Sequence, residues 1–205
     1  MKRHPQLWQF CCALCLIGLS AGASASPEMT AHRLAQAPVV DGDVLGDEAW
    51  SGAVPATGFW QVRPNAGEHA TQKTEVFVGF TETSLYIGVV ARDDNPDGII
   101  VTDSRRDSDL DDTDAFLVMI DGLLDRQNGF VFGTNAAGIE YDAQVSRDGG
   151  MGGFSNSGYN LDWDGSWSVR SRIGDFGWSA EFEIPFRTLR FGSADIQDWG
   201  INFQR

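Results

Sequence analysis

The sequence has very little cysteine, and none of it lies beyond residue 15. The three cysteines of the chain are Cys11, Cys12 and Cys15. A domain that begins after them has no thiol, no disulfide and no cysteine nucleophile. Such a domain has to be held together by its apolar core, or by its core and a bound metal.

The cysteines lie inside a predicted export signal. A basic stretch at residues 2–4 is followed by an uncharged, mostly apolar run at 7–22 and by Ala23-Ser24-Ala25. This order is typical of a secretory signal peptide, and the run is too short to be a convincing membrane anchor. We therefore expect a signal peptide at residues 1–25 and a mature domain at 26–205. The mature domain is expected in the periplasm, at the outer membrane or outside the cell.

Positive charge is also scarce. Removal of Lys2 and Arg3 with the signal leaves 13 basic and 29 acidic residues, a formal charge of −16, and Lys73 is then the only lysine. A chain this acidic repels phosphate groups, which excludes nucleic acid and anionic membranes as partners. Many aspartates in an exported protein suit calcium binding, although simple solubility explains them equally well.

Catalytic signatures are absent from the chain. Its three histidines are His4, His32 and His69, and no H-E-x-x-H, G-x-S-x-G or phosphate-loop motif occurs. Carboxylates are abundant, but a glycosidase needs two of them at a set separation in a cleft. We therefore predict that this chain is not an enzyme. If the parent protein is a glycoside hydrolase, its catalytic domain lies outside this chain.

The residues that are present alternate mostly with a period of two, which predicts strands. Expected strands cover residues 74–80, 85–91, 115–120, 130–133, 139–145, 166–173, 178–184 and 199–205. Helix is limited to about one turn at 47–51 and at 186–189. Many short strands separated by turns predict a single all-β domain, an antiparallel β-sandwich of jelly-roll type with very little helix.

An ordered set of motifs supports this prediction. Val40-Asp41-Gly42 is followed by Asp47-Glu48-Ala49-Trp50, and later motifs occupy Thr74 to Asp93, Asp111 to Asp121, Phe132 to Gly138 and Trp178 to Pro185. In this order the motifs resemble family 9 carbohydrate-binding modules, which are β-sandwiches. The resemblance covers nearly the whole mature chain. It implies non-catalytic binding of an oligo- or polysaccharide, a pair of tryptophans that bind chain ends, and structural calcium.

Three tryptophans are expected in the core and two at a sugar site. Trp50 is expected to anchor the D-E-A-W entry, and Trp167 and Trp178 are in phase with core residues. Trp163, in a polar loop without apolar partners in phase, is the first stacking candidate, and Trp60 is proposed as the opposite wall. An exposed aromatic ring suits the apolar C–H face of a sugar. Hydrogen bonds to sugar hydroxyls are expected from Arg63, Asn160 and Gln144, or from Asn65.

An acidic stretch is the candidate calcium site. Asp93, Asn95 and Asp97 form the D-x-N-x-D-G start of a calcium loop, but the closing glutamate is missing, because Ser104 stands at position twelve. Asp111 and Asp112 are expected to complete the site. The alternative is a solvated acidic loop without metal.

Two functions from different classes remain open. The first is carbohydrate binding by a monomeric secreted module that assists polysaccharide breakdown. The second is a structural or interaction domain without sugar binding, because Phe191-Gly192 and residues 199–205 also resemble bacterial proteins in which such a module precedes an outer-membrane β-barrel. On that reading the chain is a fragment that lacks its C-terminal barrel. The Gly-rich loop at 148–165 is expected to be a binding loop or to lack fixed structure.

Overall fold

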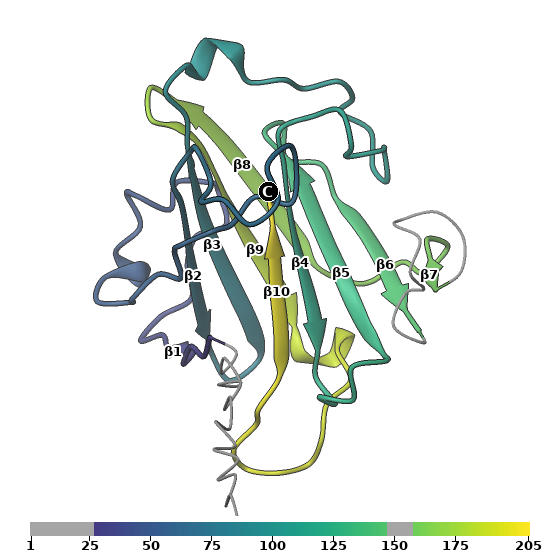
Figure 1. Cartoon of the computed structure of the whole chain (residues 1–205). Coiled ribbons are helices and arrows are strands. Elements are labelled where there is room, and N and C mark those ends of the chain that lie inside the picture. Colours follow the sequence, from purple (N-terminus) through teal and green to yellow (C-terminus); the bar gives the residue numbers. More distant parts are fainter. Residues whose placement is uncertain (1–26, 147–157) are drawn as a thin grey trace, which may run out of the picture.

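The computed structural model describes residues 27–146 and 158–205, which form two five-stranded sheets packed face to face (Figure 1). The predicted signal peptide and residues 148–157 of the Gly-rich loop lie outside the described residues. The first sheet has the order β1-β2-β3-β9-β8, and the second has the order β10-β4-β5-β6-β7. The predicted all-β sandwich with very little helix is thus confirmed.

The strands agree closely with the period-two pattern. The first sheet contains β1 (His32–Arg33), β2 (Thr74–Phe80), β3 (Ser84–Arg92), β9 (Gly177–Pro185) and β8 (Ser168–Gly174). The second contains β10 (Gly200–Gln204), β4 (Ala115–Asp121), β5 (Gly129–Asn135), β6 (Tyr141–Val145) and β7 (Tyr159–Asn160). Among the described residues, η1 (Glu48–Trp50), η2 (Pro96–Gly98) and η4 (Phe186–Thr188) are single turns of 3₁₀ helix. The short strands β1 and β7 were not expected, and β1 pairs with β2 in parallel while all other pairs are antiparallel.

The main core lies between the sheets. Alternate residues of β3, such as Ile87 and Val89, face Phe116 and Val118 of β4 and are inaccessible to solvent. Trp178 is fully buried and Trp167 nearly so, as predicted. The two uniformly apolar strands, β3 and β4, are also covered on their outer faces, which explains why their sequences do not alternate.

The N-terminal segment covers the outer face of the first sheet. Trp50 is 4% exposed and packs with Val44, Tyr86 and Val90. Gly88 of β3 lies directly beneath the indole, because a Cβ atom there would stand 3.0 Å from the ring. The predicted anchoring role of Trp50 is confirmed, and it requires a glycine in the middle of a central strand.

A buried carboxylate fixes this segment in place. Glu181 of β9 is 0% exposed and accepts hydrogen bonds from the backbone N–H groups of Asp41 and Gly42, at 3.1 and 3.0 Å, and from Trp50 Nε1 at 2.9 Å. Burial raises the pKa of Glu181, although these donors oppose the shift. The aspartate-glycine turn and the tryptophan of the entry motif therefore meet at one side chain.

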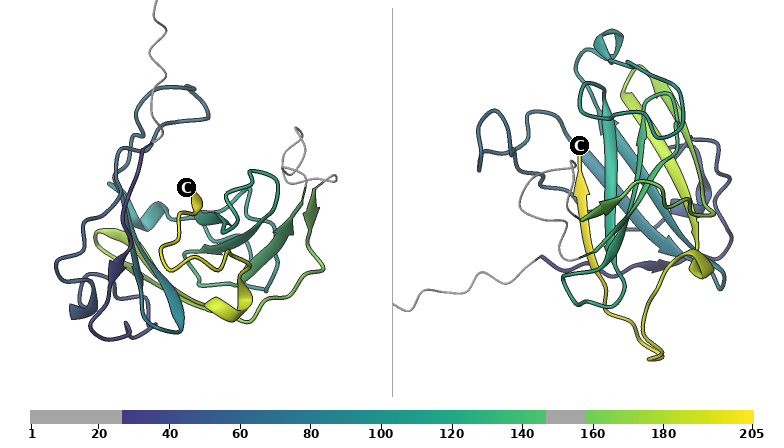
Figure 2. Two further views of the ribbon diagram at one scale, coloured as in Figure 1. Left: turned by 90° about the horizontal axis from the view of Figure 1, so that it is seen from below. Right: turned by 90° about the vertical axis from the view of Figure 1, so that its right-hand side faces the viewer.

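The opposite side of the molecule is more open. The view from below shows the two sheets diverging toward the side that carries β10 and the loop between η1 and β2 (Figure 2). Within residues 27–146 and 158–205, no helix is long and apolar enough to cross a membrane.

Candidate functional site

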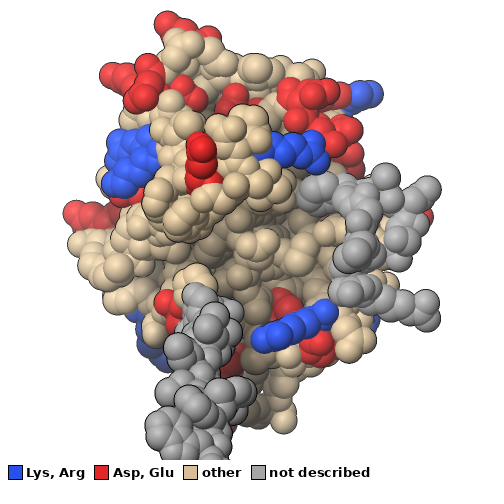
Figure 3. Space-filling view, in the orientation of Figure 1, with Lys and Arg blue, Asp and Glu red and all other residues tan. Residues whose placement is uncertain are grey.

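A wide groove follows β10 on the open side of the sandwich. Its volume is about 3220 Å³, well above the roughly 300–1,000 Å³ of a compact small-molecule pocket. Residues 27–33 and 54–65 line one side, and Trp199 and β10 line the other. The lining continues over the second sheet through residues 109–115, Leu117, Tyr141 and Leu161. Figure 3 shows the hollow as mostly uncharged surface, with acidic and basic side chains around its rim. The size of the groove suits an extended ligand, and the carboxylates in its lining disfavour an anionic one.

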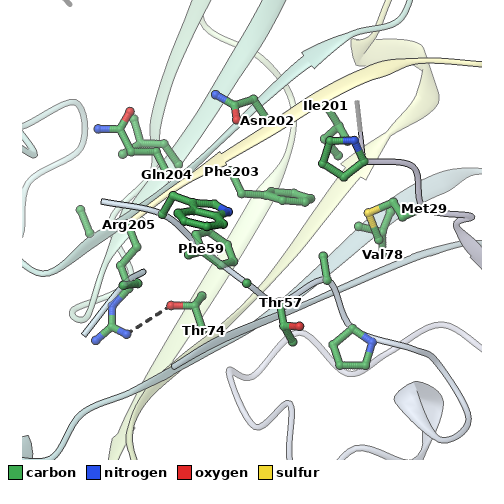
Figure 4. Close-up of a pocket in the computed structure, with 18 of the residues that line it drawn as sticks. Met29, Thr57, Phe59, Thr74, Val78, Ile201, Asn202, Phe203, Gln204 and Arg205 are labelled. Carbon is green, nitrogen blue, oxygen red and sulfur yellow. Dashed lines mark hydrogen bonds between the residues drawn. The ribbon is translucent and has the colours of Figure 1, made fainter. Parts of the chain in front are cut away.

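The β10 wall presents two kinds of side chain. Ile201 and Phe203 point toward the core, where Phe203 stacks on Phe116 with ring centroids 5.9 Å apart. Asn202 and Gln204 lie on the other face of the strand and are exposed. Figure 4 shows Phe59, Val78 and Met29 across from Ile201 and Phe203. The groove thus has an apolar floor, with amide groups along one side.

A β-hairpin-like excursion forms the opposite wall. Ala70 N donates to Phe59 O at 2.9 Å, Gln61 N donates to Glu68 O at 2.8 Å, and Trp60 is bridged to His69. Phe59 packs against the core and holds the base of the excursion. The next side chain, Trp60, therefore points outward, as expected of adjacent residues in extended backbone.

Trp60 is an exposed aromatic platform. Trp60 is 60% exposed. One face of its indole stacks on the His69 ring, with the two ring centroids 4.0 Å apart and the ring planes at 27°. Arg63 lies in the same excursion and also lines the groove. Asn65 does so as well, and the structure therefore brings together three of the six predicted sugar-site residues on one wall.

The remaining three predicted site residues gather at the opposite edge of the second sheet. Gln144 of β6 is paired in register with Asn160 of β7, and Trp163 follows shortly after. β10 and β7 are the two edges of the same sheet, so this group lies at the edge away from β10. The groove lining includes none of the three residues, although it includes Leu161, which lies between Asn160 and Trp163.

The expectation that Trp163 stands in a polar loop without apolar partners is wrong. Its ring centroid lies 4.7 Å from that of Phe130 and 6.0 Å from that of Phe132, and the side chain is half-buried against the main core. The alternation pattern could not predict this contact, because Trp163 lies in the loop between β7 and β8. Residues in a loop can pack against the core without following the period of a strand. Its role in sugar binding stays a prediction.

A network of ion pairs around Arg106 fixes the segment that contains Trp163. The Arg106 guanidinium lies within ion-pair distance of Asp107, Glu140, Asp142 and Asp164. Asp142 is 1% exposed and also accepts a hydrogen bond from Gly165 N at 2.6 Å. Burial raises the pKa of Asp142, and the hydrogen bond and Arg106 oppose the rise. This network holds the segment around Trp163 against β6.

Trp199 is a groove residue that the sequence did not identify as part of a site. It immediately precedes β10 and is half-buried in a cluster with Phe186 and Phe191, whose ring centroids lie 6.2 and 5.3 Å from that of Trp199. The only signal available was the alternation of Trp199, Ile201 and Phe203 with polar neighbours, which marks a strand rather than a site.

Two further polar groups affect the electrostatics of the groove. Burial raises the pKa of Tyr141, which lines the groove, to about 12, so its phenol remains a neutral hydrogen-bond donor. Arg205 donates to Thr74 Oγ1 at 3.3 Å, as Figure 4 shows, and lies 3.7 Å from Asp93.

The predicted calcium ligands do not converge. Asp93 Oδ1 accepts from Asn95 N at 2.8 Å in a local turn, and Asp97, Asp111 and Asp112 are exposed. In the part of the chain that the structure describes, no three acidic, histidine or cysteine side chains are close enough to hold a metal ion. These five residues therefore do not form a preassembled calcium site, and calcium binding stays a prediction.

The fold matches solved carbohydrate-binding modules. Two structures of a family 9 module from Caldicellulosiruptor kristjanssonii, in complex with glucose and with cellotriose, align with TM-scores of 0.52 and 0.53 at 11% and 13% identity. Each alignment covers 85% of this chain and 76% or 75% of the module.

A proposed carbohydrate-binding protein from Bacteroides uniformis aligns with a TM-score of 0.59 at 13% identity, over 85% of this chain and 81% of its own. No family model and no curated protein matches the sequence. The chain therefore has the fold of family 9 carbohydrate-binding modules.

Proposed function

We propose that this chain is a non-catalytic carbohydrate-binding module that binds an oligo- or polysaccharide in the groove beside β10. The observation that carries the proposal is Trp60, an indole that is held by its own excursion and exposed on the wall of the groove. A sugar stacks its apolar face on such a ring while side-chain amides and hydroxyls bind its hydroxyl groups. The fold of the two modules solved with glucose and cellotriose supports the same function.

Further parts of the proposal rest on the sequence alone. The signal-peptide pattern supports export of the chain to the periplasm, the outer membrane or the cell exterior. We further propose that the module acts as a monomer and assists polysaccharide breakdown by keeping an attached or separate hydrolase near its substrate. A β-barrel domain joined to the C-terminal side is the proposed arrangement of the parent protein.

A glycan array tests the central proposal. The purified chain, Trp60→Ala, Trp163→Ala and a control, Ile196→Ala, are compared on the array. Ile196 is 85% exposed and does not line the groove. We expect one neutral glycan class to retain the unmodified chain and the control, and we expect Trp60→Ala to lose most of the retention.

Each other outcome has a defined meaning. Loss of retention by Trp163→Ala alone, with Trp60→Ala unaffected, would move the sugar site to the β7 edge. Silence across the array, from a chain that circular dichroism shows to be folded, would contradict sugar binding and favour a structural or interaction domain.

A further inference from the structure

Two loops lie side by side at one end of the sandwich. The turn at residues 122–128 joins β4 to β5, and the connection at 189–199 joins η4 to β10 (Figure 1). β4 ends at Asp121, which pairs in register with Gly200 at the start of β10. The two loops therefore leave the second sheet at the same point and project from the same end.

Exposed apolar side chains gather on these loops. Leu123 and Leu124 on the first loop and Phe191 and Ile196 on the second are between 39% and 85% exposed. The loops touch, because a Cβ atom on Gly122 would stand 3.1 Å from Phe191 Cβ. We call these four side chains the apolar end patch. Large apolar groups gathered in this way mark a contact with another molecule or with a membrane.

The turn holds its leucines outward at a conformational cost. Leu124 and Arg126 adopt φ angles of 53° and 57°, in the left-handed region that few residues other than glycine, asparagine and aspartate occupy. The Asp121 carboxylate fixes the turn by accepting hydrogen bonds from three backbone N–H groups, those of Leu123, Asp125 and Arg126, at 3.2, 3.3 and 2.7 Å. A strained leucine that the surrounding bonds hold in solvent supports a role in contact rather than in folding.

The second loop has a fixed base and a projecting apolar side chain. The ring centroid of Phe191 lies 5.3 Å from that of Trp199, which is half-buried. Gln197 Nε2 donates to Gly192 O at 3.1 Å and closes the loop. Ile196 immediately precedes this glutamine and is the most exposed member of the apolar end patch. Both loops thus present apolar groups from a supported backbone.

The charges beside the patch are nearly balanced. In the two loops and η4, the exposed cations are Arg126, Arg187 and Arg190, and the exposed anions are Asp195 and Asp198. This end therefore suits a surface that presents phosphate and ammonium groups together. A strongly anionic surface is disfavoured, because the chain as a whole carries a formal charge of −14.

From this arrangement we infer that the end of the sandwich with the apolar end patch rests on a zwitterionic phospholipid surface, where the four side chains enter the boundary between headgroups and acyl chains. Projecting side chains need no matching hollow in a bilayer, whereas a protein partner has to present a complementary surface. The export predicted from residues 1–25 brings the chain to such a surface. Leu123, Phe191 and Ile196 lie outside the groove lining, so this contact is additional to the proposed sugar binding.

Sedimentation with phospholipid vesicles tests the inference. The chain is purified after export, and mass spectrometry confirms removal of the signal, because the apolar run at residues 7–22 would itself bind lipid. We expect binding to phosphatidylcholine vesicles and weaker binding to vesicles of phosphatidylcholine and phosphatidylglycerol in equal amounts. The double variant Leu123→Ser/Ile196→Ser is expected to lower the partition coefficient by at least about tenfold, since each apolar side chain that enters the bilayer contributes to binding.

Two further variants separate loss of contact from loss of folding. Ile100→Ser replaces an isoleucine that is 56% exposed in the loop between β3 and β4, at the opposite end of the sandwich, and it is expected to bind vesicles like the unmodified chain (Figure 1). Leu124→Asn suits the left-handed backbone better than leucine does. We expect it to keep or raise the melting temperature while it lowers the partition coefficient by several-fold.

The possible results are distinct. The inference is overturned if the folded chain does not bind phosphatidylcholine vesicles, if it binds the phosphatidylglycerol mixture more tightly, or if the double variant binds like the unmodified chain. Self-association without vesicles that the double variant abolishes, together with no vesicle binding, would instead make the patch an interface between copies. Glycan retention by the double variant is expected to be unchanged, since Leu123 and Ile196 do not line the groove. Failure of lipid binding therefore leaves the proposed function standing.

Discussion

Trp50 and Trp60 lie in consecutive stretches of the same N-terminal region, yet the fold uses them in opposite ways. Trp50 seals the outer face of the first sheet, where it is 4% exposed and its indole N–H is bonded to Glu181. Trp60 stands on the groove side, 60% exposed, with one ring face on His69. Burying an aromatic ring stabilises the folded chain, whereas leaving one exposed forgoes that gain. The contrast therefore separates a side built for stability from a side suited to binding.

The largest expected effect is the loss of Trp50. Replacement by alanine removes a buried indole above Gly88 and leaves the Glu181 carboxylate without one of its donors. Large-to-small substitutions of this kind cost about 3–5 kcal/mol, so we expect Trp50→Ala to lower the free energy of unfolding by that amount. Urea denaturation followed by circular dichroism measures the change. A loss below about 1 kcal/mol would show that the N-terminal cover contributes little.

Glu181 provides the second test of the sealed side. Glu181→Ala leaves the N–H groups of Asp41, Gly42 and Trp50 without their acceptor, and each buried unpaired group costs about 1–3 kcal/mol. We expect a loss of about 3 kcal/mol for alanine. Glu181→Gln, which keeps one acceptor oxygen, is expected to lose less. Equal losses for the two variants would contradict a hydrogen-bonding role.

The raised pKa of Glu181 predicts that the stability of the fold depends on pH. Burial raises the pKa of Glu181 in the folded chain above its ordinary value of 4.5. Folding therefore favours the protonated form, so the stability that this group contributes is complete below pH 4.5 and is lost as the pH rises through the raised pKa. Denaturant unfolding from pH 4 to 8 should show this decline in the unmodified chain and a flatter profile in Glu181→Gln.

The sequence predicted the sealed side better than the open side. Strands β2, β8 and β9 follow from their alternation, because burial on one face imposes a period on the residues it selects. β3 follows from its uniformly apolar run, and Trp50 follows from its motif. The sequence did not identify Glu181 as the hydrogen-bonding partner of Trp50. Glu181 occupies the polar phase of β9, which is typical of a residue facing solvent, and it is buried only because a segment far away in the chain covers it.

The groove was harder to predict because its residues come from connections and from an edge strand. Trp60 was identified as a candidate wall, but Trp163 was ranked above it, and only the fold reveals that the ring of Trp163 contacts Phe130. Trp199 gave no local signal of binding, since its place in the groove depends on β10 pairing with β4. Contacts between segments far apart in the chain leave no pattern in either segment alone.

Calcium is expected to have a smaller effect on stability, by binding and stabilising the open side of the molecule. The carboxylates of Asp93, Asp111 and Asp112 line the groove, and binding would have to draw them together, which places the affinity near the weak end of about 10⁻⁴–10⁻³ M. At 10 mM calcium such a site contributes about 1.4–3 kcal/mol, or a rise in melting temperature of several degrees. Thermal unfolding with calcium and then with chelator measures it. An unchanged melting temperature would exclude calcium as a structural ligand.

The smallest expected change in stability comes from Trp60. Trp60→Ala removes a ring that is mostly in solvent and packs mainly on the exposed His69, so the free energy of unfolding should change by no more than about 0.5 kcal/mol. The unfolding free energies of Trp60→Ala and Trp50→Ala are measured in the same urea series. The two variants carry the same substitution and differ only in its position. A loss of several kcal/mol would mean that Trp60 supports the fold, and its exposure would then no longer argue for a ligand. An unchanged stability together with reduced glycan retention would assign its ring to binding alone.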